Sequence, residues 1–247
     1  MSYKHYKNYK NPPLNEVVFE IQLEAIVPDV IDSLSEICQE LEMEYPNQKK
    51  KYTGEFSFNL EGNEKSFAAS KARHSLEGFL LYSQDEKRVL HLMQDAFAIS
   101  ILRPYTGWDD AFAFFMKYWK KYSDKITPKY INRIAIRSIN VISNVASREI
   151  SEYISLDQDA EIGCLLGFFD KRIFSVDQQA QFQAVITKTA NDIDGNQANI
   201  ILDIDVSNIT KREYRSVDIQ SVFESIRMHK NKIFESIITE KSRRQFN

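Results

Sequence analysis

The sequence predicts an α+β fold, in which antiparallel sheet meanders carry long helices packed on one face. Short segments of alternating polar and apolar residues recur along the chain, with the period of half-buried strands. Two long stretches, near residues 106–122 and 217–238, instead space their apolar residues as helices do. Only seven glycines and six prolines occur, and no low-complexity linker separates independent domains. Helices segregated to one face of an antiparallel sheet define this class.

The first part of the chain reads as a strand, a helix, a meander and a long helix. The strand covers residues 16–24, and the helix is expected over 28–44. The lysine run at 49–51 is interpreted as a solvated loop. Strands are expected at 55–60, 65–72, 79–83, 88–93 and 96–102. A helix with Thr106 as its N-cap then continues to about residue 122.

The second part repeats this plan. A strand at 131–141 precedes a short helical stretch at 148–154. Strands follow at 173–176, 180–189 and 198–206, and a helix is expected over 217–238. The order of elements suggests two similar halves, residues 1–126 and 127–247, within one compact unit.

The two leading strands carry opposite charges. Side chains alternate faces along a strand, so Glu16 and Glu20 share one face of the first strand. In the second, Arg133 and Arg137 share a face with Ile131. One hypothesis is a pocket between the halves in which an arginine holds an anion, because guanidinium captures carboxylate or phosphate in a bidentate manner. The other is a structural ladder of ion pairs.

Other candidate chemistry is sparse. Asp203 and Asp205 share a strand face, which is either a solvated surface or two ligands of a divalent cation. Asp194-Gly195 is typical of a hairpin turn rather than a calcium loop. The four histidines are scattered, and the chain has no Gly-x-Ser-x-Gly elbow, phosphate loop or dinucleotide fingerprint. We therefore expect no catalytic residues, metal ligands or cofactor.

Bulk properties restrict the partners. The net charge of −3 argues against broad nucleic-acid binding, which needs clustered positive charge. A local contact at the basic residues near 241–244 is a secondary interpretation. Cys38 and Cys164 are read as free thiols in a reducing compartment. The polar N-terminus lacks the apolar core of a signal peptide, and no segment is long and apolar enough for a membrane span. These features predict a cytoplasmic protein.

Three short motifs resemble a known family. Residues 11–20, Asn-Pro-Pro-Leu-Asn-Glu-Val-Val-Phe-Glu, resemble the N-terminal signature of a sporadically distributed, uncharacterised prokaryotic family. Residues 137–141 match its central strand in part, with Ser138 and Val141 in place of an aromatic residue and an arginine. Phe234-Glu235 and Thr239-Glu240 match its final helix. The resemblance implies no activity. The candidate binding residues are Glu16, Glu20, Arg133, Arg137 and Asn140. The family's patchy occurrence implies defence-associated or mobile genes.

These observations favour a non-enzymatic interaction or regulatory protein, acting in a defence or toxin–antitoxin-like system. A wide aromatic arc on the helix at 106–122 is either core packing or a surface for a protein partner or for self-association. The alternative is a small-anion or nucleotide-binding protein, or an enzyme, with a pocket between the halves.

Overall fold

An antiparallel sheet of ten strands organises the described part of the chain. The structure is a computed structural model that describes residues 9–24, 30–55, 73–156, 167–192 and 196–247. Nine strands lie in the order β2-β3-β4-β5-β1-β6-β9-β8-β7, and β10 pairs with β6. The predicted α+β class with an antiparallel sheet is confirmed. Residues 56–60 of the strand expected at 55–60, the strand expected at 65–72, the tip of the turn at Asp194-Gly195 and Cys164 lie outside the described residues.

The elements before residue 127 start with the leading strand and end with a long helix. They are β1 (Leu14–Leu23), α1 (Val30–Glu40), β2 (Asn47–Glu55), β3 (Arg73–Tyr82), β4 (Arg88–Met93), β5 (Ala96–Leu102) and α2 (Trp108–Ile126). The predicted bounds of β4 and β5 are confirmed. Thr106 is not the cap of α2: Gly107 holds that position at φ 128°, a conformation that side chains disfavour.

The elements after residue 127 start with the longest strand of the sheet. They are β6 (Tyr130–Ala146), the 3₁₀ turn η1 (Ser147–Glu149), α3 (Ile150–Tyr153), β7 (Gly167–Asp177), β8 (Phe182–Asp192), β9 (Gln197–Asn208), β10 (Arg212–Glu213), η2 (Tyr214–Ser216), α4 (Ile219–Ile237) and α5 (Glu240–Phe246). The Asp218 side chain caps α4 by accepting a hydrogen bond from the Ser221 backbone N–H at 3.1 Å.

The lysine run forms the edge strand β2 and not a loop. Lys49 lies opposite Leu80 and Lys51 lies opposite Gly78 in the ladder with β3. Backbone hydrogen bonds hold this strand, so its side chains need not be apolar. Lysines are also common on edge strands, because their charge discourages pairing with another chain.

The two leading strands pair directly at the centre of the sheet. Val18 lies opposite Arg137, and Gln22 lies opposite Arg133. The register then shifts, so that Leu23 lies opposite Ile131. This irregularity turns Ile131 to the same face as buried Leu23, which corrects the expected face of Ile131.

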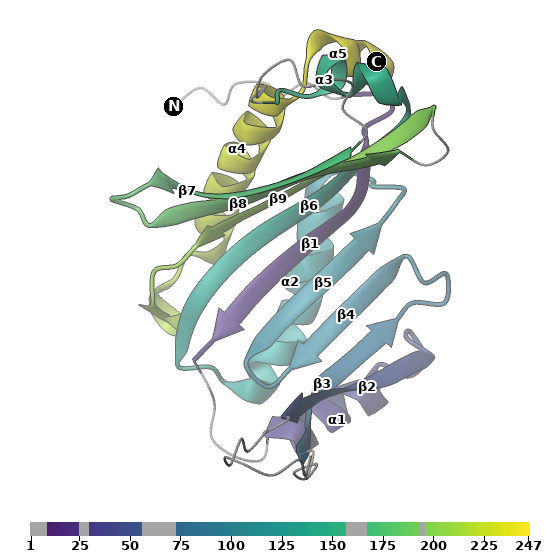
Figure 1. Cartoon of the computed structure of the whole chain (residues 1–247). Helices are drawn as coiled ribbons and strands as arrows, with labels where there is room; N and C mark the ends of the chain where they lie inside the picture. The colour runs from purple at the N-terminus through teal and green to yellow at the C-terminus, as the bar shows by residue number, and fades with distance from the viewer. Residues whose placement is uncertain (1–8, 25–29, 56–72, 157–166, 193–195) are drawn as a thin grey trace, which may run out of the picture.

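The core lies on one face of the sheet. Figure 1 shows α1, α2 and α4 behind the sheet, whose other face is turned to the viewer. Phe19 of β1 is fully buried there, with ring centroids 5.7 Å from Phe115 of α2 and 5.6 Å from Phe223 of α4. Phe115, Trp119 and the other inward residues of α2 are buried, so most of its aromatic arc is core packing.

The opposite face carries the charged residues of β1 and β6, and none of the helices in the described ranges covers it. We call it the open face. Within those same ranges, no helix combines the length and apolarity that crossing a membrane requires.

We expect Phe19→Ala to lower the free energy of unfolding by about 3–5 kcal/mol, because it opens a cavity where helices from both parts of the chain meet the sheet. Urea denaturation measures the loss. Met43→Ala is the control, since Met43 is 96% exposed and its truncation should cost less than ~0.5 kcal/mol. Similar losses for the two variants would contradict this account of the core.

Candidate functional site

A row of ion pairs crosses the open face at the middle of the sheet. Arg133 donates through Nη1 to Glu20 Oε1 at 3.0 Å, and through Nη2 to both carboxylate oxygens of Asp205 at 2.7 and 2.8 Å. One guanidinium on β6 therefore joins carboxylates on β1 and β9. The three side chains are between 18% and 26% exposed, so water screens them only in part.

Arg137 makes a second, separate pair with Asp203. Its Nε and Nη2 donate to the two carboxylate oxygens at 2.9 and 2.6 Å, which is the parallel fork geometry of a strong arginine–carboxylate pair. Hydrogen bonding to Asp203 raises the pKa of Arg137. We call the five residues Glu20, Arg133, Arg137, Asp203 and Asp205 the charged seam.

The strand register explains why these pairs form. Arg137 lies directly opposite Asp205 on β9, yet it bonds to Asp203, the diagonal neighbour. The diagonal partner of Arg133 is Glu20, because Gln22 lies opposite Arg133 on β1, and its bond to Asp205 spans a longer offset along β9. Diagonal neighbours in an antiparallel sheet lie within reach of long side chains. Asp203 and Asp205 are thus arginine partners, and their carboxylates face guanidinium groups instead of bulk water.

The remaining sequence-predicted site residues lie apart from the seam. Glu16 is on the open face, where it acts on Arg137 only at longer range, and no ion pair of Glu16 occurs in the part of the chain described. Asn140 is buried on the helix side of the sheet, and its Nδ2 donates to Leu202 O at 3.1 Å. The five predicted residues therefore do not form one cluster.

Both arginines of the seam are bonded to carboxylates. Glu16, Glu20, Asp203 and Asp205 contribute four negative charges to this region, against two positive charges from Arg133 and Arg137, a difference of −2. An anion that displaced Glu20 or Asp205 from Arg133 would leave that carboxylate partly buried without a counterion. The centre of the open face is electrostatically suited to cations.

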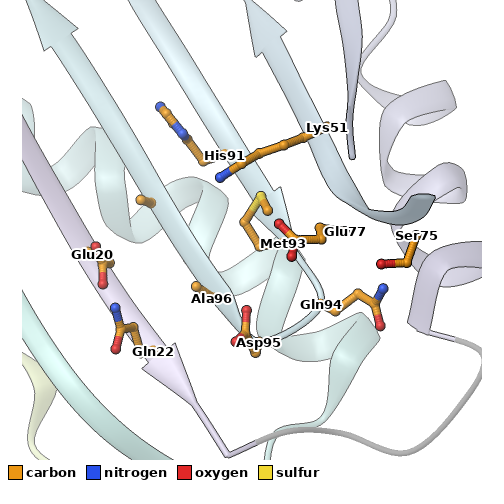
Figure 2. A pocket seen from close by; sticks show the side chains of 11 residues that line it. Glu20, Gln22, Lys51, Ser75, Glu77, His91, Met93, Gln94, Asp95 and Ala96 are labelled. Carbon is orange, nitrogen blue, oxygen red and sulfur yellow. The ribbon is translucent and has the colours of Figure 1, made fainter. Parts of the chain in front are cut away.

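A pocket adjoins the seam on the same face. It encloses about 500 Å³ and extends from β1 across β5 and β4 to β3 and β2. Figure 2 shows Glu20 and Gln22 on one side, Lys51, Ser75 and Glu77 on the other, and Gln94 and Asp95 at the turn between β4 and β5. The rest of the lining is His91, Met93, Ala96 and Ala98.

A bulge places Glu77 in this pocket. Lys51 lies opposite Gly78, but Tyr52 lies opposite Leu76, so Glu77 is the extra residue of β3. The next residue must be glycine, because a Cβ at Gly78 would collide with the carbonyl oxygen of Leu92 on β4. Sequence periodicity could not reveal Glu77 as a pocket residue, since a bulge changes the face on which a side chain lies.

The pocket is acidic. Its charged lining consists of three carboxylates, from Glu20, Glu77 and Asp95, and one ammonium group, from Lys51. Burial, and secondarily the charge of Lys51, lowers the pKa of His91, so its imidazole is neutral at pH 7. The ring accepts or donates one hydrogen bond, between Nε2 and Ser100 Oγ at 3.2 Å. Cations are therefore the ligands that this lining favours.

The chain matches no protein-family model, and no curated protein is similar to it in sequence. The resemblance carried by residues 11–20 and 137–141 stays a prediction.

We expect Arg133→Met to lower the free energy of unfolding by about 2 kcal/mol. The substitution leaves Glu20 and Asp205 partly buried without their shared cation, which places its cost between that of an exposed pair and that of a buried pair. Arg137→Met is the matched control. Arg137 is 50% exposed and should cost less than ~1 kcal/mol. Equal losses in urea denaturation would show that Arg133 does not hold the seam together.

We expect protein stability to fall as the pH drops below about 7. The pKa of His91 in the folded protein is lower than the value of about 6.5 in an unfolded chain, so the unfolded chain takes up this proton first. The stabilisation is complete above the unfolded pKa and is lost as pH falls through 6.5 towards the folded pKa. His91→Gln should make the free energy of unfolding depend less on pH. Urea denaturation between pH 7.5 and 5, a range that brackets the unfolded pKa, measures this change.

Two further variants make the histidine measurement specific. Ser100→Ala keeps the buried imidazole and should keep the pH dependence. Burial also lowers the pKa of His229, so His229→Gln measures the second contribution separately. A pH dependence that is unchanged in His91→Gln would assign the effect to other groups.

Proposed function

We propose that this protein is a non-enzymatic interaction or regulatory protein that binds a basic partner on the open face of its sheet. The observation that carries the proposal is the pocket of about 500 Å³ lined by Glu20, Glu77 and Asp95. Ligand pockets commonly have volumes of roughly 300–1,000 Å³, so a side chain of a partner protein fits this space. A lysine or arginine side chain has the complementary charge and can bond to several carboxylates at once.

The position of the pocket supports a protein partner. The pocket adjoins the charged seam at Glu20. This residue lines the pocket and also accepts a hydrogen bond from Arg133 of the seam. A basic segment bound in the pocket would therefore extend towards a region with two uncompensated carboxylate charges. Electrostatic complementarity of this kind raises association rates and excludes acidic partners.

The order of the strands supports the proposal of two similar halves. Outward from the centre, β1 and β6 are followed by β5 and β9, then β4 and β8, then β3 and β7. Each leading strand is followed in the chain by a helix, and each meander by a long helix, α2 or α4. We propose that the open face is a joint surface of residues 1–126 and 127–247, and that its partner contacts both.

The biological setting is part of the same proposal. A role as a component of a defence or toxin–antitoxin-like system is supported by the resemblance of residues 11–20 to a patchily distributed family. The alternative of a small-anion or nucleotide-binding protein has less support, because Arg133 and Arg137 are each bonded to carboxylates.

We expect a fluorescein-labelled peptide with four arginines in a Gly-Ser spacer to bind, and its citrulline counterpart not to bind, because citrulline keeps the shape but loses the charge. The double variant Glu77→Gln/Asp95→Asn should weaken binding of the arginine peptide by about tenfold, if each carboxylate contributes about 0.7 kcal/mol. Fluorescence anisotropy at low and moderate salt measures both effects.

The control is a variant with the same change in net charge on the helix side. Glu36→Gln/Asp124→Asn removes two exposed carboxylates of α1 and α2, which pair with Lys125 and Lys120. It should change the affinity less than twofold. An equal loss in both double variants would mean that net charge alone attracts the peptide, and absence of binding to the unmodified protein would refute a cation pocket.

A further inference from the structure

The two edges of the sheet differ in a way that points to self-association. The edge strand β2 carries three consecutive lysines, at positions 49–51, which protect an edge from pairing. The other edge strand, β7, has a ladder partner on one side only among the described residues. Its Phe169 is 71%, its Ile173 68% and its Phe174 44% exposed. An edge with exposed apolar side chains and unpaired backbone groups is a template for another strand.

The sequence of β7 is complementary to itself. Residues 168–174 read Phe-Phe-Asp-Lys-Arg-Ile-Phe, a palindrome in residue character centred on Lys171. Two antiparallel copies centred on Lys171 place Phe168 opposite Phe174, Phe169 opposite Ile173, and Asp170 opposite Arg172. Apolar residues then meet apolar residues and each acid meets a base, twice, as a two-fold axis requires.

The faces of the strand agree with this register. Phe169 and Ile173 lie on the open face, aligned through β8 with Ile201 and Asp205 of β9. Phe174 lies on the helix side, where it lines a groove of about 370 Å³ with Ile233 and Ile237 of α4. Pairing would thus cover apolar surface on both faces of the edge.

We propose that β7 pairs with β7 of a second copy of this chain, which joins two sheets into one across a two-fold axis at Lys171. The Asp170 carboxylate bonds within its own chain to Arg172 at 2.9 Å and Lys188 at 3.1 Å, and in the dimer it also faces Arg172 of the other copy. The two Lys171 side chains lie opposite each other, and their repulsion weakens the dimer. The pairing is independent of the pocket, which lies over β1 to β5.

Charge exchange tests the register. Asp170→Lys places a lysine opposite Arg172, and Arg172→Glu places a glutamate opposite Asp170, so each variant alone should be monomeric where the unmodified protein dimerises. An equimolar mixture should recover dimers. Position 170 of the Asp170→Lys variant then faces position 172 of the Arg172→Glu variant, which pairs the two introduced charges. The other contact pairs Arg172 of the first variant with Asp170 of the second. Sedimentation velocity measures the association, with circular dichroism as the folding check. A monomeric unmodified protein, dimers of either single variant, or a mixture that stays monomeric would each overturn the proposal.

Disulfide trapping tests the position of the axis. In a Cys164→Ser background, Lys171→Cys places the two thiols opposite each other and should give a cross-linked dimer on oxidation. Ser175→Cys is the control, because the two copies of residue 175 lie about 27 Å apart along this ladder at ~3.4 Å per residue. Cys38 is buried and should stay unreactive. Efficient trapping through residue 175, or none through residue 171, would exclude this register.

Lys171→Thr should tighten the dimer about threefold by removing the repulsion.

Discussion

The structure depends on the pairing of β1 with β6. These strands are separated by more than a hundred residues in the chain, yet they lie side by side at the centre of the sheet, and all other strands are added outward from them. A slip of one residue would turn Phe19 and Ile134 to the open face and the charged residues into the core. The register is therefore fixed by burial on the helix side and by Arg133 on the open side.

The same register separates the two faces into different chemistries. On the helix side, Phe19 contacts rings from α2 and α4, so both parts of the chain share one core. On the open side, Arg133 joins β1 to β9 across β6. A hydrophobic core is non-directional, whereas a bidentate guanidinium has a defined geometry. The core thus supplies most of the stability, and the seam contributes directional contacts that match only one alignment of the three strands.

Sequence reasoning predicted what depends on local period and missed what depends on register. The bounds of β4 and β5 follow from alternation and flanking turns, and alternation also placed Glu20 and Arg133 on strand faces that the structure brings together. The prediction that Asn140 shares a binding site with Arg137 did not take account of this alternation, which puts Asn140 on the buried helix side. Asp203 and Asp205 were recognised as sharing a face, but their arginine partners require the long-range pairing of β6 with β9. Glu77 could not be found, since the bulge that exposes it is a property of two strands together.

The two ends of the sheet carry different side chains. At the β2 end, three lysines prevent edge pairing and one of them, Lys51, also lines the pocket beside Glu77. The lysines therefore disfavour pairing of β2 with another strand, and the acidic pocket lies beside them on the open face. At the β7 end, exposed Phe169 and Ile173 flank a complementary pair of charges, which suits this edge to the pairing that we propose. In a dimer built through β7, the two acidic pockets would lie far from the axis on opposite arms of one extended sheet. A single basic partner could engage both only if its own binding segments were widely spaced, so dimerisation would select for a repeated or two-fold symmetric partner.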